Sequence, residues 1–118
     1  MACTILIVDD HPSFRASARV VLEAEGFDVV GDAADGASAI SECHRLQPQV
    51  VLLDVQLPDI DGFDVCEQIV KNNGHPVVIM TSSRDSSDFG PLVSTCGAGG
   101  FVPKAELSGE RVQELLTP

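Results

Sequence analysis

Five polar residues that follow short apolar runs of the sequence could together bind a cation and a phosphate group. Asp9 and Asp10 follow one run, Asp54 follows another, and Thr81 and Lys104 stand at the ends of two more. Taken singly, each has a plain structural explanation, such as favouring a helix start, capping a loop or lying in solvent. Because all of them stand where strands are predicted to end, a shared site explains them better than coincidence does.

Three carboxylates held close together repel one another, and at least one of their pKa values rises unless something compensates. A hard divalent cation such as Mg²⁺ removes this repulsion, since it prefers oxygen ligands and keeps several of its waters. The ammonium of Lys104 could hold an oxygen of a phosphoryl group as a point charge. The residue types therefore indicate a Mg²⁺ site that leaves room for phosphate.

The elements that would position these residues alternate between strands and helices. Strands are expected at short runs that are mostly apolar at every position, as in parallel strands covered on both faces. These runs are Thr4–Val8, Val29–Val30 with its flanks, Val50–Leu53, Val77–Met80 and Gly100–Val102. Between them, apolar residues recur three and four positions apart, which predicts helices with one buried stripe each. The stripes are Phe14, Ala18, Val21 and Leu22; Ile40, Cys43 and Leu46; Val65, Cys66, Ile69 and Val70; and Val112, Leu115 and Leu116.

Residues that start or stop helices agree with this division. Pro12 suits a first helical position, Gly26 a helix end and Ser108 a helix cap, while a fourth helix is expected to be short and to start near Pro91. Alternating β and α units over residues 1–118 predict one α/β domain, a single doubly wound five-stranded parallel sheet with right-handed crossovers. Ligands of such sheets bind beyond the carboxyl ends of the strands, where the polar residues stand.

Composition excludes several classes of partner. The 18 acidic and 7 basic residues give a formal net charge of −11, which repels nucleic acid and anionic lipid. No stretch reaches the roughly 20 apolar residues of a membrane span, and no signal peptide is expected. The four cysteines are scattered without a Cys-x-x-Cys pair, as in reduced, structural cysteines of a cytoplasmic protein. The histidines His11, His44 and His75 lack metal-ligand spacing and are expected on the surface.

Four parts of the chain, in order and covering nearly all of it, resemble the motifs of the response-regulator receiver family. Ile5–Asp10 resembles the first strand and acidic pair, and Val51–Pro58 with Asp61–Gly62 resembles the phosphoacceptor strand and its turn. Pro76–Thr81 resembles the switch-hydroxyl strand, and Gly97–Lys104 resembles the closing segment with an aromatic residue and a lysine. One such motif is modestly specific, but four in register are strongly so.

The resemblance implies a flavodoxin-like (βα)5 fold with strand order 2-1-3-4-5 and a phosphorylation-dependent signalling switch. Asp54 would be the nucleophile that accepts a phosphoryl group. Asp10, Asp54 and the backbone carbonyl of Gln56 would bind Mg²⁺ directly, and Asp9 would help through water. Apart from Mg²⁺-dependent phosphorylation and dephosphorylation of itself, the chain is not expected to be an enzyme.

The same resemblance assigns the switch. Lys104 would contact the phosphoryl group, Thr81 would hydrogen-bond to it, and Phe101 would turn inward behind Thr81. The face formed by the fourth helix, fifth strand and fifth helix would then change shape. Two departures from the family pattern bear on this face: Gly90-Pro91 weakens the fourth helix, and Phe101 lacks the hydroxyl of a tyrosine.

The implied phosphodonor is a histidine kinase or a small phosphodonor, and the implied output is an unnamed downstream protein, with a homodimer left open. Asp9–Arg15 and Val29–Ala33 are most similar to receivers of the LuxR-like branch, which usually carry a helix-turn-helix after the receiver. The chain stops at Pro118, just after the last predicted helix, so a stand-alone receiver is expected and no DNA contact by this chain.

Three other interpretations fit less well. A phosphohydrolase of the haloacid dehalogenase type requires a second Asp, as acid and base, two residues after the nucleophile, and this chain has Gln56 at that position. A pseudo-receiver that only binds protein would lack part of the acidic pair or the lysine, and Asp9, Asp10 and Lys104 are all present. A flavodoxin-like FMN binder would need a hydroxyl- and glycine-rich loop after the first strand, which is missing.

Overall fold

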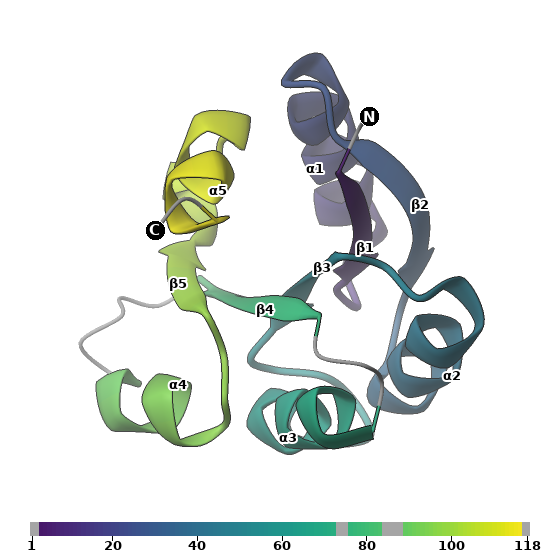
Figure 1. Ribbon diagram of the computed structural model, residues 1–118, viewed down its shortest axis with the longest axis vertical. Helices are drawn as coiled ribbons and strands as arrows, with labels where there is room; N and C mark the ends of the chain where they lie inside the picture. The colour runs from purple at the N-terminus through teal and green to yellow at the C-terminus, as the bar shows by residue number, and fades with distance from the viewer. Residues whose placement is uncertain (1–2, 73–75, 84–88, 117–118) are drawn as a thin grey trace.

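Five parallel strands form one sheet in the computed structural model, which describes residues 3–72, 76–83 and 89–116. The strands are β1 (Thr4–Val8), β2 (Asp28–Ala33), β3 (Val50–Asp54), β4 (Val77–Ser82) and β5 (Gly100–Pro103). Their order across the sheet is β2-β1-β3-β4-β5. The predicted strand order and parallel arrangement are confirmed (Figure 1).

Helices cover both faces of this sheet, as expected of a doubly wound fold. They are α1 (Pro12–Ala24), α2 (Gly36–Leu46), α3 (Gly62–Asn72), α4 (Gly90–Thr95), the 3₁₀ turn η2 (Lys104–Glu106) and α5 (Gly109–Leu116). Helices α1 and α5 lie on one face, and α2, α3 and α4 lie on the other (Figure 1). In the part of the chain that the structure describes, no helix is both long and apolar enough to cross a bilayer.

Strands β1 and β3 are buried almost throughout, and this packing fixes the positions of their carboxyl ends. Successive strand residues face opposite sides, so Leu6 and Leu53 join the apolar layer toward α2, α3 and α4, while Ile7 and Leu52 join the layer toward α1 and α5. Each buried aliphatic side chain contributes about 1.5–3 kcal/mol. A sheet packed on both sides in this way holds the polar residues after its strands in fixed positions.

The expected helix boundaries are confirmed at three positions. Pro12 opens α1, Gly26 takes a left-handed conformation (φ +96°) just after α1, and Ser108 Oγ accepts a hydrogen bond from the Arg111 backbone N–H (3.0 Å) at the start of α5. Helix α4 is short, with six residues, and Pro91 lies in its first turn.

One expectation about burial is wrong. The helical spacing predicts Val21 in the buried stripe of α1, but this residue is 37% exposed, whereas Ala18 and Leu22 are buried as predicted. The buried stripe is turned toward Arg15, whose guanidinium donates to the backbone carbonyl of Asp9. Val21 lies about 100° around the helix from Leu22, at the edge of the buried stripe.

Cysteine and histidine positions follow the sequence analysis, with one histidine outside the described residues. All four cysteines carry free thiols; Cys43, Cys66 and Cys96 are buried and Cys3 is partly buried. His11 and His44 are exposed. His75 falls outside the described part of the chain.

Candidate functional site

Strand register brings the predicted site residues together at the carboxyl edge of the sheet. Val8 pairs with Leu53, so Asp9, just after β1, lies beside Asp54, the last residue of β3, and Asp54 pairs directly with Thr81 on β4. Lys104 follows β5 and places its Nζ 2.6 Å from Asp9 Oδ2 and 3.2 Å from Asp54 Oδ2. The structure therefore joins two of the three predicted carboxylates to the predicted lysine.

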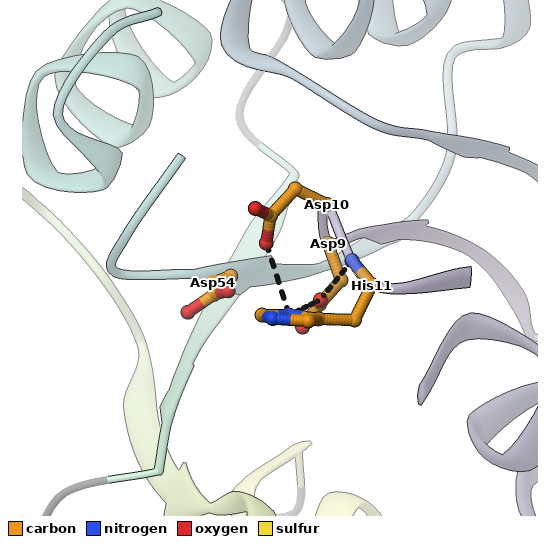
Figure 2. A group of neighbouring side chains, drawn as sticks. All are labelled: Asp9, Asp10, His11 and Asp54. Atoms are coloured by element: carbon orange, nitrogen blue, oxygen red, sulfur yellow. Dashed lines mark hydrogen bonds and ion pairs between the residues drawn. The ribbon is translucent and has the colours of Figure 1, made fainter. Parts of the chain in front are cut away.

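Asp10 completes the acidic group from the more exposed side. The ligand atoms of Asp9, Asp10, His11 and Asp54 all lie within 4.8 Å of one another. Figure 2 shows the four side chains converging from the ends of β1 and β3. Asp9 and Asp54 are buried at the base of the group, whereas Asp10 and His11 face solvent.

Backbone and side-chain contacts hold Asp9 and Lys104 in place. The Asp9 backbone N–H donates to the Ala33 carbonyl (3.0 Å), and Asp9 Oδ1 accepts from the backbone N–H of His11 (2.8 Å). The ammonium of Lys104 lies 4.7 Å from the centroid of the Phe14 ring, at the start of α1. This cation–π contact adds to the two carboxylates in directing the lysine into the site.

Electrostatics at Asp54 favour the binding of positive charge. Burial raises the pKa of Asp54, and the negative charge of Asp9 raises it further, while the Gln56 backbone N–H (3.2 Å) and the Lys104 ammonium only partly offset this. Burial alone lowers the pKa of Lys104, but its contacts with Asp9 and Asp54 outweigh burial and the net shift is upward. One ammonium thus leaves the buried carboxylates incompletely neutralised.

A pocket of about 300 Å³ opens beside these groups. Its lining consists of Asp10, His11, Asp54, Gln56, Leu57, Pro58, Ser83 and Lys104. The pocket gives Asp54 and Lys104 access to a ligand the size of a phosphoryl group, while the strands close its base.

The hydroxyl of Thr81 is a donor without a partner. Thr81 is fully buried, and its Oγ1 makes no hydrogen bond to any described residue. Leaving a buried hydroxyl unpaired costs about 1–3 kcal/mol. Since Thr81 pairs with Asp54 across the β3–β4 ladder, an acceptor attached to Asp54 is the natural partner for this group.

The loop from β3 to α3 is fixed from both ends. A Cβ at Gly62 would lie 2.3 Å from the Asp54 carbonyl oxygen, so only glycine allows the loop to fold back this tightly. Asp61 Oδ1 accepts from the Phe63 N–H (2.8 Å) and caps α3, and Asp59 accepts from the Gly36 and Ala37 N–H groups (2.7 and 3.0 Å) at the start of α2. Hydrogen bonds from Gly36 and then Ala37 lower the pKa of Asp59.

Phe101 is a predicted site residue that does not line the pocket. Its ring is partly buried and lies 6.0 Å from the ring of Phe89, which is 5.8 Å from the ring of Phe63. These three rings connect β5 to the starts of α4 and α3.

The donor set fits Mg²⁺ on the chemistry of its atoms. Two buried carboxylates and an exposed one offer oxygen ligands, and Gln56 lines the same pocket. Burial and then the charge of Asp9 raise the pKa of Asp54, and a divalent cation would favour its ionised form. The residues required for such a site are therefore all present.

Sequence reasoning missed three contributors to the site. His11 is exposed, as the sequence predicts, but its imidazole also belongs to the acidic group. Ser83 lines the pocket, and Asp59 ties the β3–α3 loop to α2. The position of His11 next to the acidic pair was an available signal for the first, whereas the reach of Asp59 across 23 residues is visible only in the fold.

Comparison with known families gives a match over nearly the whole chain. A family model described as the response regulator receiver domain matches residues 5–116. A putative transcriptional regulator of Pseudomonas aeruginosa PAO1 is 35% identical over 95% of this chain and 52% of its own length. The DNA-binding response regulator MtrA of Mycolicibacterium smegmatis is 42% identical over 85% of this chain and 43% of its own length. The chain thus spans about half the length of the curated relatives it matches.

Solved structures give the same result. The receiver domain of a putative NarL response regulator from Mycobacterium tuberculosis superposes with a TM-score of 0.85, at 28% identity over 99% of this chain and 98% of that one. A LuxR-family response regulator from Aurantimonas sp. SI85-9A1 gives 0.84, at 29% identity over 96% of this chain and 81% of that one.

Proposed function

The chain belongs to the response regulator receiver domain family, and we propose from this premise that it is a signalling switch in which Asp54 accepts a phosphoryl group. The supporting observation is the convergence of Asp54 with Asp9, Lys104 and Asp10 beside one pocket. We also propose that residues 1–118 form one receiver domain that acts in the cytoplasm and does not itself bind nucleic acid.

The proposed reaction transfers phosphorus to one Asp54 carboxylate oxygen. This oxygen forms a bond to phosphorus while the bond from phosphorus to the donor breaks, and the electron pair of that bond leaves with the donor group. The donor is a phosphohistidine of a histidine kinase or a small acyl phosphate. Phosphoryl transfer depends mainly on in-line positioning and on neutralising the equatorial oxygens.

The chain's own residues supply most of this positioning. Lys104 Nζ, now on Asp9 and Asp54, is placed to bind a phosphoryl oxygen, and the unpaired Thr81 hydroxyl is placed to donate to another. Asp9, Asp10, Asp54 and the backbone carbonyl of Gln56 would hold Mg²⁺, which supplies further neutralisation of the phosphoryl charge. Apart from this self-phosphorylation and self-dephosphorylation, no enzymatic activity is proposed.

The proposed output is a change at the face formed by α4, β5 and α5. A Thr81 side chain drawn toward the phosphoryl group leaves space beside β5 for the Phe101 ring. Because Phe101 contacts Phe89 just before α4, its movement would reach α4 directly. A downstream protein or a second copy of the chain would then bind the altered face.

The test is incubation with acetyl phosphate and Mg²⁺ followed by intact mass measurement. One phosphoryl adduct is expected for the wild type and for Asp28→Asn, a matched control whose carboxylate stands at the opposite end of the sheet. None is expected for Asp54→Asn. An adduct of equal yield on Asp54→Asn would overturn the assignment of the phosphoacceptor.

A further inference from the structure

His11 brings an imidazole nitrogen into the acidic group. Its Nδ1 lies 3.0 Å from Asp9 Oδ1 and 3.0 Å from Asp10 Oδ1, and Figure 2 shows its ring beside Asp54. The His11 backbone is also held here, since its N–H donates to the same Asp9 oxygen (2.8 Å) just before the start of α1. The ring is therefore held near the carboxylates although it is 64% exposed.

The spacing of these atoms suits a first-row transition metal. All four ligand atoms lie within 4.8 Å of one another. An ion with bonds of roughly 2.0–2.2 Å separates its ligands by at most about 4.4 Å. Asp10 and His11, the two exposed members of the group, would close on an ion that the buried Asp9 and Asp54 hold.

The two oxygens of Asp9 face different neighbours, which leaves room for a cation beside the lysine. Oδ1 faces His11, whereas Oδ2 contacts Lys104 Nζ at 2.6 Å. A cation that binds Oδ1 together with His11 and Asp10 need not displace Lys104.

An imidazole changes which cation this site prefers. Mg²⁺ selects oxygen ligands, whereas Zn²⁺, Ni²⁺ and Cu²⁺ bind imidazole well, so one nitrogen among carboxylates favours the transition metals. We propose that His11, Asp9, Asp10 and Asp54 form a mixed nitrogen–oxygen site for a divalent transition metal of the Zn²⁺ type, which competes with Mg²⁺. The proposal deepens the proposed function, since the competing ion would occupy the place assigned to Mg²⁺.

Zn²⁺ affinity, measured by competition calorimetry on the untagged chain, tests the ligand assignment. The Cys3→Ser background removes the one cysteine that is not buried. His11→Ala should weaken Zn²⁺ binding by roughly tenfold or more, in line with the loss of one protein ligand, and should weaken it much more than it changes Mg²⁺ binding. His44→Ala is the matched control, because it removes an exposed histidine at the end of α2 and should change neither affinity.

His11→Asn guards against a folding artefact, because asparagine is a favoured residue at the position before a helix. It should keep the melting temperature and lose Zn²⁺ affinity as His11→Ala does. A ¹⁵N spectrum of the histidine side chains adds a direct readout, in which Zn²⁺ should shift the His11 Nδ1 resonance and leave that of His44 unchanged. Equal Zn²⁺ affinity in wild type and both His11 variants, or an unshifted His11 nitrogen, would overturn the proposal.

Failure of the proposed function would look different. Phosphorylation by acetyl phosphate is measured on the wild type and on His44→Ala with Mg²⁺ alone, without Zn²⁺, so that its outcome does not depend on the His11 variants. Zn²⁺ binding that depends on His11 in a chain that forms no adduct on Asp54 would reject the phosphorylation proposal and keep the metal site. The reverse result would reject the metal site alone.

Discussion

Two residues, Asp54 and Thr81, are left incompletely compensated in the unphosphorylated site, and phosphorylation of Asp54 would compensate both. Asp54 is a buried carboxylate beside the carboxylate of Asp9, and burial and then this neighbouring charge raise its pKa, while Thr81 has a donor without an acceptor. A phosphoryl group on Asp54 would bring acceptor oxygens for Thr81 and, with a cation, compensate the charge. The polar groups of the unphosphorylated site therefore lie where a phosphoryl group and a cation could pair with them.

Thr81→Val should separate stability from switching. Valine has nearly the shape of threonine and removes the unpaired hydroxyl, so the free energy of unfolding should stay equal or rise by up to about 1 kcal/mol. Beryllofluoride, a phosphoryl mimic, should shift the amide resonances of Phe101 and Val112 in the wild type and in Thr81→Ser, and much less in Thr81→Val. Equal shifts in all three proteins would show that another group drives the switch.

Asp54→Asn should stabilise the metal-free protein in a pH-dependent way. The folded-state pKa of Asp54 lies above its unfolded value, so the folded state binds more protons between the two, and its stability falls as pH rises through this window. The uncharged amide of the Asp54→Asn variant avoids that loss, and each unit of raised pKa corresponds to about 1.4 kcal/mol. Thermal unfolding from pH 3 to pH 7 should therefore show the variant's advantage at neutral pH closing in acid. A constant difference, or the same trend in Asp28→Asn, would contradict this reason.

At the scale of elements, the β3–α3 loop is positioned by a helix that is distant in sequence. Asp59 caps α2 through Gly36 and Ala37, while Asp35, the residue before α2, caps the same helix through the Ser38 N–H (2.7 Å). Both carboxylates satisfy unpaired N–H groups in the first turn. Only Asp59 also ties that turn to the loop that carries Gln56.

Asp59→Ala and Asp35→Ala should therefore differ in one respect. Both should lower the melting temperature, because both leave N–H groups of α2 without a carboxylate. Only Asp59→Ala should also weaken Mg²⁺ binding, by up to roughly tenfold, as expected when a group that orients a metal ligand is lost. Calorimetric titration with Mg²⁺ measures the difference. Unchanged Mg²⁺ affinity in Asp59→Ala would mean that the loop holds its shape without this contact.

The sequence predicted the elements well because each carried a local signal. Apolar runs predicted all five strands, and the residues that follow them, Asp9, Asp54, Thr81 and Lys104, were predicted to meet because parallel strands end at one edge. Contacts set by packing between elements left no such signal. The exposure of Val21 depends on how α1 packs against the sheet, and the cap from Asp59 depends on the place of α2 beside the loop.

At the scale of the whole molecule, acidic charge and the cation site must be distinguished. A net charge of −11 means that any cation reduces repulsion among surface carboxylates and so stabilises the fold. A rise in stability on adding Mg²⁺ is therefore not by itself a sign of a specific site. The buried group at Asp9 and Asp54 differs from the surface because water and salt screen it much less.

Mg²⁺ should stabilise the wild type beyond the effect of ionic strength, and Asp10→Asn should lose that excess. Binding to the folded state alone adds RT ln(1 + [Mg²⁺]/Kd), about 2.7 kcal/mol at one hundred times Kd, whereas screening depends on ionic strength. Melting temperatures in MgCl₂ should therefore exceed those in NaCl at matched ionic strength.

Asp10 is the exposed carboxylate of the group, so replacing it removes a proposed ligand without leaving an unpaired buried charge. Metal-free Asp10→Asn should be at least as stable as the wild type because one repulsion is gone, and its MgCl₂ and NaCl curves should coincide. An Mg²⁺ excess that survives in Asp10→Asn would remove Asp10 from the set of ligands.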